Sequence, residues 1–438
     1  MNRMHTSLVV ISVFLALAPS TLASTTWFVD GVNGNDSNNC TSAQTACKTI
    51  GHAISLATSG DSIIAAPATY TENLTTGFSL NVIGSGANTT IIDGGGVKAV
   101  VVIPSTSAFV TLSGLTIRNG YARAGGGIGN SGILTINNST VSANRALWYG
   151  GGISNGGSAT INNTTISGNK APGSPYCIMG QICDPSGGGI YNSSSATLTM
   201  SNSTVWRNSA GGTIRSCLAG SHCYSDGGGI FNQGKMIMSN TAVAANTASW
   251  PPNGPPGHGG GISNAGTAII NNSTLVRNGA PSGGGIYNFG TATISNSTLS
   301  GNDAFSGVGI SNNVGSSMAL QNTIVDHNIL TGTVYRSENC SGTLNSLGYN
   351  LSSDGTCSFN SRGDLNNHDP LLGPFQNNGG PTGTMALLPG SPAIDAGNPS
   401  GCTDGQGHLL KTDQRGMPRP DPEDTGGCDI GAYESQND

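Results

Sequence analysis

Short stretches in which apolar residues alternate with Ser, Thr and Asn recur through the middle of the chain. Residues 135–141, 160–166 and 293–299 show the pattern most clearly. Alternation with a period of two is typical of short β-strands that bury one face. We find no stripe of apolar residues at helical spacing in this part of the sequence. The pattern therefore predicts strands.

A second motif, Gly-Gly-Gly-Ile-x-Asn, recurs between these stretches. Seven copies, the last of them degenerate, begin at Gly125, Gly150, Gly187, Gly227, Gly259, Gly283 and Gly307. The shortest step between copies is about 24 residues, and longer steps are this unit with an insertion. A repeat of this length predicts a solenoid in which each unit adds one turn. We predict an all-β fold, a single-stranded right-handed parallel β-helix.

Three sets of side chains are expected to line up along the axis of this solenoid. The isoleucines of the motif should stack inside it: Ile128, Ile153, Ile190, Ile230, Ile262 and Ile286. The asparagines of the motif should form a ladder of amide hydrogen bonds: Asn130, Asn155, Asn192, Asn232, Asn264 and Asn288. A second row of asparagines is Asn144, Asn169, Asn208, Asn246, Asn278, Asn302 and Asn328.

The start of the chain has the pattern of an export signal. Residues 1–23 hold a basic start, an apolar run over 8–18 and small residues before Ser24. We predict that they are a secretory signal peptide, because the apolar run is too short to span a membrane. The protein is therefore expected outside the cell or at its surface.

Three further regions follow the signal peptide. Residues 24–109 are predicted to form the N-terminal cap and first coils, with a short capping helix over 49–57. Residues 110–330 hold the repeat body. Residues 331–438 lack the repeat, are rich in Gly, Pro and Asp, and are predicted to form a loop-rich cap on the other end.

Composition narrows the classes of partner. Charged residues make up 9% of the chain and the net charge is −6, so the sequence offers no basic patch for nucleic acid. We expect a monomer that carries no transmembrane segment after the signal peptide.

An even number of cysteines in an exported chain predicts disulfides. We predict pairing between near neighbours: Cys40–Cys47, Cys177–Cys183, Cys217–Cys223, Cys340–Cys357 and Cys402–Cys428.

Several stretches resemble known secreted proteins. Residues 27–36 and 67–72 look like the N-terminal entry of bacterial right-handed β-helix proteins of the pectin-lyase-like superfamily. Residues 386–398, 412–416 and 428–434 are similar to the choice-of-anchor Q domain. The repeats also resemble those of polymorphic outer-membrane proteins. These resemblances imply a secreted or surface-displayed protein of the β-helix fold.

Insertions and aromatic residues gather at one corner of the predicted coil. The insertions span 170–186, 209–226 and 247–258 and leave three consecutive coils at the same point. Aromatic rings along a groove suit the stacking of sugar faces, whereas rings that only cover their own loops would be structural. We predict a ligand-binding set at this corner: Tyr121, Trp148, Tyr149, Tyr176, Tyr224 and Trp250.

Two other kinds of chemistry are weighed against simple binding. Asp184 and Asp226, with Arg215 and His258 nearby, would serve a polysaccharide lyase or glycoside hydrolase if the carboxylates met in an open groove. The loop holding Asp30 and Asp36 would accept Ca²⁺, although no cofactor is required by the sequence.

The function that the sequence favours is a non-catalytic, exported rod that presents an aromatic face to a polysaccharide or cell-surface glycan. A polysaccharide-degrading enzyme is the first alternative, and a purely structural surface protein is the second.

Overall fold

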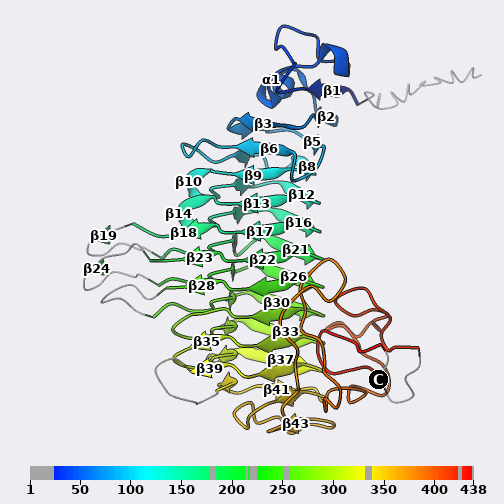
Figure 1. Ribbon diagram of the computed structural model, residues 1–438. Helices are drawn as coiled ribbons and strands as arrows, with labels where there is room; N and C mark the ends of the chain where they lie inside the picture. The colour runs from blue at the N-terminus through cyan, green and yellow to red at the C-terminus, as the bar shows by residue number, and fades with distance from the viewer. Residues whose placement is uncertain are drawn as a thin grey trace, which may run out of the picture.

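Parallel strands build the rod that forms most of the molecule. The computed structural model describes residues 24–174, 176–177, 184–212, 216–217, 224–249, 256–330, 338–422 and 427–436. Three long sheets run the length of the rod, and each strand pairs in parallel with the strand one coil further on (Figure 1). The predicted right-handed parallel β-helix is confirmed.

The strands fall into sheets A, B and C, with a shorter sheet D at one corner. Sheet A comprises β1 Thr26–Val29, β2 Asp61–Ala65, β5 Leu80–Gly84, β8 Phe109–Ser113, β12 Ile133–Asn137, β16 Ser158–Asn162, β21 Thr197–Ser201, β26 Lys235–Ser239, β30 Thr267–Asn271, β33 Thr291–Ser295, β37 Ser317–Gln321 and β41 Asn345–Ser346. Sheet B comprises β3 Ala68–Thr71, β6 Thr90–Asp93, β9 Thr116–Arg118, β13 Thr140–Ser142, β17 Thr165–Ser167, β22 Thr204–Trp206, β27 Ala242–Ala244, β31 Thr274–Val276, β34 Thr298–Ser300, β38 Ile324–Asp326, β42 Leu351–Ser352 and β43 Leu365–Asn366.

Sheet C holds the repeated motif. It comprises β4 Leu74–Thr75, β7 Val101–Ile103, β11 Ile128–Asn130, β15 Ile153–Asn155, β20 Ile190–Asn192, β25 Ile230–Asn232, β29 Ile262–Asn264, β32 Ile286–Asn288, β36 Ile310–Asn312 and β40 Cys340–Ser341. Sheet D comprises β10 Tyr121–Ala124, β14 Arg145–Tyr149, β18 Lys170–Ala171, β23 Ser209–Ala210 and β28 Thr247–Ala248. Two short pairs complete the strands: β19 Tyr176–Cys177 with β24 Ser216–Cys217, and β35 Asp303–Ala304 with β39 Ile329–Leu330.

The interior follows the predicted columns. Ile128, Ile153, Ile190, Ile230, Ile262 and Ile286 pair in register on consecutive coils and are buried. Each coil reaches this column through a tight turn that only glycine fits. Gly227, for example, has a φ of +64°, and a Cβ on it would collide with the carbonyl oxygen of Ile230.

Both asparagine ladders are confirmed. In the first row each Nδ2 donates to the Oδ1 of the next coil over 2.7–2.8 Å, from Asn130 to Asn312. In the second row the same bonds measure 2.9–3.0 Å and continue from Asn144 to Asn339. Because these amides are buried, each bond satisfies polar atoms that water does not reach.

The N-terminal end is capped as predicted. The 3-10 turn η1 (Ala43–Thr45) precedes helix α1 (Ile50–Leu56), whose first turn is held by the side chains of Thr49 and Glu72. The Glu72 carboxylate accepts hydrogen bonds from the amides of Ile50 at 2.9 Å and Gly51 at 2.7 Å. The stretch 67–72 that resembles a family landmark therefore has a structural role here.

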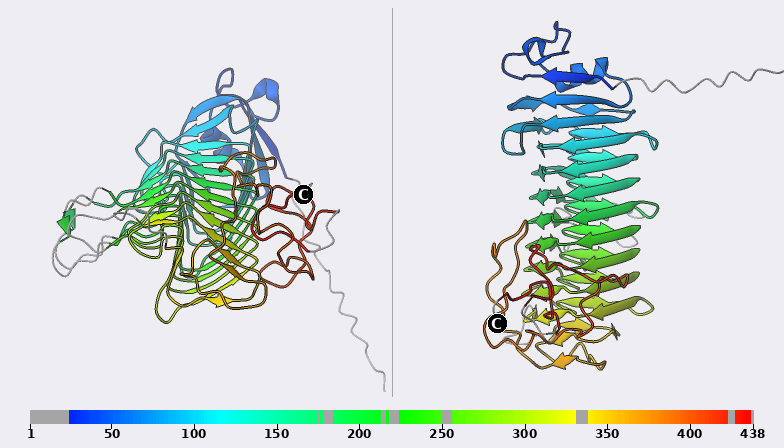
Figure 2. Two further views of the ribbon diagram at one scale, coloured as in Figure 1. Left: turned by 60° about the horizontal axis from the view of Figure 1, so that its bottom comes forward. Right: turned by 90° about the vertical axis from the view of Figure 1, so that its right-hand side faces the viewer.

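The C-terminal region departs from the expected end cap. Residues 340–366 add further strands to sheets A, B and C, so the β-helix extends beyond residue 330. Most of the remaining chain runs back along the side of the rod rather than across its end (Figure 2). Thr274 Oγ1 donates to Gln414 Oε1 over 2.6 Å, and Arg419 Nη1 donates to Asn272 Oδ1 over 3.0 Å.

Polar side chains on the outer surface of the coils explain why the C-terminal segment lies against the side of the rod. In the later coils, Asn272 and Thr274 are buried beneath the C-terminal segment, whereas the equivalent Asn163 is exposed and Thr165 half-buried. The hydroxyls and amides of the coil surface thus serve as hydrogen-bond partners for the returning chain.

Three of the predicted disulfides are present: Cys40–Cys47, Cys340–Cys357 and Cys402–Cys428. Cys183 and Cys223 lie outside the described residues, so the pairs Cys177–Cys183 and Cys217–Cys223 stay predictions. The backbones of Cys177 and Cys217 pair directly between β19 and β24.

Among the described residues, no helix has the length and apolar character needed to cross a bilayer. The predicted signal peptide, residues 1–23, also lies outside them.

Candidate functional site

The insertions return to the coil side by side, as predicted. Their C-terminal ends form a chain of single parallel bridges that links Ser186 to Asp226, Asp226 to His258 and His258 to Ser282. Strands β19 and β24, which belong to two of these insertions, pair with each other on one side of the rod (Figure 1). Consecutive coils therefore bring Asp226, His258 and their neighbours into one strip of surface, which we call the loop corner.

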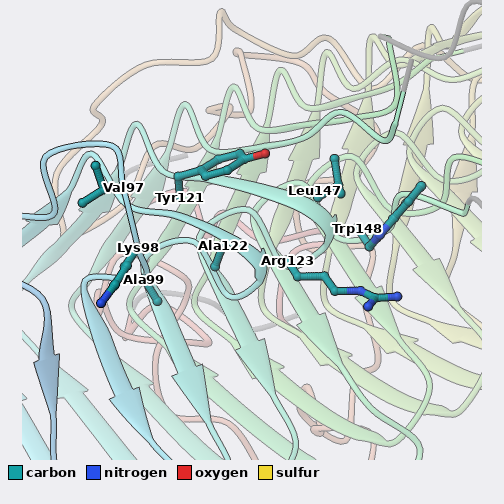
Figure 3. Close-up of a pocket in the computed structure, with 8 residues that line it drawn as sticks. All are labelled: Val97, Lys98, Ala99, Tyr121, Ala122, Arg123, Leu147 and Trp148. Atoms are coloured by element: carbon teal, nitrogen blue, oxygen red, sulfur yellow. The ribbon is translucent and has the colours of Figure 1, made fainter. Parts of the chain in front are cut away.

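The predicted ligand-binding residues separate into two places. Tyr121 and Trp148 line a shallow pocket of about 550 Å³ between neighbouring coils (Figure 3). Tyr149 and Tyr224 lie elsewhere on the surface. For Tyr176 only the backbone is described, and Trp250 lies outside the described residues, as does Arg215.

The shallow pocket combines rings with basic side chains. Its lining is Val97, Lys98, Ala99, Tyr121, Ala122, Arg123, Leu147 and Trp148. Strands β10 and β14 pair in parallel and carry the two rings on adjacent coils. Figure 3 shows Lys98 and Arg123 on opposite sides of the small residue Ala122. A ligand with both an apolar face and a polar or anionic group fits this lining.

A longer set of rings starts at the end of β14 and continues over sheet C to the turn after β32, and we call it the aromatic row. Its members are Tyr149, Tyr191, Phe231, Phe289 and Tyr287. Successive ring centroids are 4.8 Å, 5.8 Å, 6.3 Å and 5.8 Å apart. Such separations are those of interacting aromatic pairs.

Four of these five rings were not among the predicted site residues. Tyr191, Phe231 and Tyr287 occupy the variable position of Gly-Gly-Gly-Ile-x-Asn, between an inward isoleucine and an inward asparagine. Strand alternation places that position on the outer face. The sequence signal was therefore present in the motif itself.

An open cleft of about 410 Å³ lies at one end of the aromatic row. It is lined by Tyr224, Asp226, Pro256, His258, Tyr287, Phe289 and Asn313. Asp226 Oδ1 lies 2.9 Å from His258 Nδ1, and both side chains are largely buried. The imidazole packs between two rings, with its centroid 4.3 Å from that of Tyr287 and 5.5 Å from that of Tyr224. We call this arrangement the Asp226–His258 cleft.

The tyrosines around this surface keep their protons at neutral pH. Burial raises the pKa of Tyr287, and the nearby carboxylate of Asp226 raises it further. Burial and the charge of Asp184 likewise raise the pKa of Tyr149. The hydroxyl groups therefore stay able to donate hydrogen bonds. Tyr191 already donates, to Gln233 Oε1 over 2.7 Å.

The two predicted catalytic carboxylates lie on neighbouring coils but have different partners. Asp184 Oδ1 accepts a hydrogen bond from the Tyr224 amide over 2.9 Å, whereas Asp226 orients His258. A hydrolase that uses two carboxylates needs one as an acid and the other as a nucleophile or base. The observed contacts instead make Asp226 and His258 a dyad, in which the carboxylate fixes the imidazole.

The Asp30 and Asp36 side chains hold turns together. Asp30 Oδ1 accepts bonds from the amides of Val32 and Asn33, and these bonds lower the pKa of Asp30. Asp36 Oδ1 accepts bonds from the amides of Lys48 and Thr49. Ca²⁺ binding by this loop stays a prediction.

Comparisons with known proteins return solved structures alone. No family model and no curated protein sequence matches the chain. The XylC protein in complex with xylose matches with 9% identity and a TM-score of 0.48, over 94% of this chain and 98% of its own. A pectate lyase matches with 17% identity and a TM-score of 0.43, over 95% and 98%.

A pectin methylesterase from Erwinia chrysanthemi matches with 13% identity and a TM-score of 0.35, over 78% of this chain and 94% of its own. Identities this low concern the course of the backbone and say nothing of activity. The fold is a right-handed parallel β-helix, and the likenesses to the pectin-lyase-like superfamily and to the choice-of-anchor Q domain stay predictions.

Proposed function

We propose that the protein is an exported glycan-binding rod whose ligand lies along the aromatic row and ends in the Asp226–His258 cleft. The observation that carries the proposal is the row itself. Five aromatic side chains gather along sheet C and at its margins, in a chain whose aromatic content is only 5%. Rings with polar neighbours suit sugars, which present both apolar faces and hydroxyl groups.

The dimensions of the row suit a polymer rather than a single sugar. The row runs from the coil of Tyr149 to that of Tyr287, which is four coil steps along the axis. At about 4.8 Å a step, the row is roughly 19 Å long. Phe289 is 39% exposed and Tyr287 is half-buried, so the end of the row near the cleft offers apolar area to a ligand.

The charge of this surface favours a neutral glycan. Asp184 and Asp226 lie beside the row, and Asp226 already contacts the His258 imidazole. A polyanion would meet the Asp184 carboxylate near Tyr149 and the Asp226 carboxylate near Tyr287, at the two ends of the row. Uncharged polysaccharides meet no such repulsion and can accept hydrogen bonds from the protonated tyrosines.

A second candidate function is acid–base catalysis on the bound glycan, and the Asp226–His258 dyad favours it. The carboxylate occupies Nδ1 and thereby leaves Nε2 to exchange a proton with a ligand in the cleft. The volume of about 410 Å³ is enough for a small part of such a ligand.

One experiment separates the two functions. The full chain is incubated with insoluble polysaccharides of neutral, acidic and amino-sugar type, and protein depletion and released sugar are measured in the same tubes. We expect depletion by a neutral polymer without release. Depletion by none of the polymers would contradict the proposal.

Release would support the enzyme only if the dyad causes it. His258→Gln removes the titratable imidazole but keeps a polar side chain of similar reach. Loss of release in this variant, with depletion unchanged, would establish the catalytic function. Unchanged release would place any activity elsewhere.

A further inference from the structure

A separate group of titratable side chains lies where the last coils meet the C-terminal segment. Asp326 ends β38 and His327 follows it, while Asp369 belongs to the segment that leaves the final coil after β43. One ligand atom from each of the three side chains lies within 4.8 Å of the other two. The bonds from a divalent ion to imidazole and carboxylate are about 2.0–2.2 Å long. A small closing movement of these side chains would place all three around one ion.

A buried carboxylate oxygen in this cluster has the imidazole of His327 as its close neighbour. Asp326 is 3% exposed, and its Oδ2 accepts a bond from Ser300 Oγ over 3.2 Å. Its Oδ1 is removed from water and lies directly against His327 Nδ1, with which it forms an ion pair when the imidazole is protonated. An anionic oxygen removed from water in this way is costly unless a positive charge neutralises it.

The backbone fixes the three positions before any ion arrives. His327 has a φ of +40°, and Ala245 and Arg277 occupy the same corner of earlier coils with φ of +54°. This left-handed corner therefore belongs to the coil and is not peculiar to the cluster. The His327 amide donates to Ser353 Oγ over 3.0 Å.

Hydrogen bonds also hold Asp369, the third residue of the cluster, and its neighbour in place. Asp369 Oδ1 accepts a bond from the Leu371 amide over 2.9 Å, and the neighbouring His368 amide donates to Ser352 O over 3.2 Å. The side chain of His327 is 62% exposed, so an ion and its water ligands can enter from solvent.

We propose that Asp326, His327 and Asp369 form a binding site for a divalent transition-metal ion of the Zn²⁺ type. One imidazole with two carboxylates suits Zn²⁺ or Mn²⁺ better than Ca²⁺ or Mg²⁺, which prefer oxygen ligands alone. The ion neutralises the buried oxygen of Asp326. It also ties the C-terminal segment, through Asp369, to the last coils of the rod.

The test uses the untagged full chain after treatment with a chelator. Zn²⁺ is titrated by calorimetry, and the thermal midpoint is measured with and without the ion. We expect one strong site for each chain and a rise in the thermal midpoint, because the ion binds the folded state. His327→Asn and Asp369→Asn should each weaken Zn²⁺ binding by about tenfold or more. Asn tolerates the left-handed backbone at residue 327, and both side chains are exposed, so these variants should fold.

The chain offers a matched control. His408 lies 3.0 Å from Asp404 in an exposed pair that has no third ligand of this kind among the residues that the structure describes. His408→Asn should leave Zn²⁺ binding unchanged. The absence of a strong site, or a site that is unaffected by both cluster variants, would overturn the proposal. Neither result bears on glycan binding at the aromatic row.

Discussion

In the strands of sheet C that carry the repeated motif, the inward-facing residues are constant, whereas the outward-facing residue varies. Inside, isoleucine and asparagine repeat on seven consecutive coils, because each side chain must stack on its own kind at one coil spacing. Outside, the single residue between them changes from coil to coil: Gly129, Ser154, Tyr191, Phe231, Ser263, Tyr287 and Ser311.

This contrast shows which part of the repeat is free to carry function. The inner positions are fixed by packing and by the amide ladders, so substitutions there should act on stability. Among the outer positions, Tyr191 and Tyr287 are partly exposed, so substitutions there should act on binding, whereas Phe231 and Ser263 are buried. Substitutions at inner and at outer positions therefore test this division separately.

Charge in the inner column should have the largest effect. Ile230 is fully buried between Ile190 and Ile262. Ile230→Asp would bury an unpaired carboxyl group, and we expect a loss of at least about 4 kcal/mol in unfolding free energy. Chemical denaturation followed by circular dichroism measures it.

The control places the same change on an outer face. Ile237 lies on β26 and is half-buried, so Ile237→Asp should cost far less. Equal losses for both variants would break the division between inner and outer positions.

Charged groups buried between the rod and the C-terminal segment should titrate as groups in a protein interior do. Asp429 is 1% exposed, and burial followed by the charge of Glu434 raises its pKa to about 7. The unfolded chain has the ordinary pKa of about 3.9, so the folded state binds more protons between these values. Stability contributed by this group is present below about pH 4 and is lost as the pH rises through about 7.

The size of that pH effect is at most about 4 kcal/mol, from about three pKa units at 1.36 kcal/mol each. Denaturation of the wild type and of Asp429→Asn between pH 4 and pH 8 measures it. We expect the variant to show a shallower fall in stability with rising pH. Parallel curves would show that Asp429 does not titrate in this way.

Loss of one rung from an asparagine ladder should have an intermediate effect. Asn246 donates to Asn278 Oδ1 and Val205 O and accepts from the side chain and amide of Asn208. Asn246→Ala leaves buried polar groups unpaired, and we expect a loss of about 2–3 kcal/mol. Thermal and chemical melting check it.

Asn162→Ala is the comparison for the ladder. Asn162 lies on sheet A, is half-buried and bonds to Asn137 and Ser201 near the surface. We expect a loss below about 1 kcal/mol, because water can replace its partners. A larger loss than for Asn246→Ala would contradict the assignment of the ladder as the stabilising element.

The fold could be predicted because its signal repeats. The period, the isoleucine column and both asparagine rows are visible in the sequence, since stacking requires the same residue at each coil. The course of residues 370–436 was not visible, because it depends on hydrogen bonds between unlike residues far apart in sequence, such as Gln414 with Thr274.

The candidate site was predicted only in part. The loop corner, Tyr149, Tyr224, Asp226 and His258 were found from the insertions and from local clustering. The prediction did not include Tyr191, Phe231, Tyr287 and Phe289. The variable position of the motif is Gly or Ser on the other coils, so it gives no repeated aromatic signal. The Asp226–His258 contact depends on the register between two insertions of different length, which no local pattern reveals.

The central claim is that the aromatic row binds a glycan while contributing little to stability. The most direct measurement is the affinity of the wild type, Tyr287→Ala and Trp206→Ala for a soluble oligosaccharide from the bound polymer, with melting curves of all three. Trp206 is a control because it is 42% exposed on sheet B and stacks on Arg207. We predict that Tyr287→Ala weakens binding by about three- to tenfold with nearly unchanged melting, and that Trp206→Ala binds like the wild type. Equal binding by all three proteins, or a large loss of stability in Tyr287→Ala, would contradict the account.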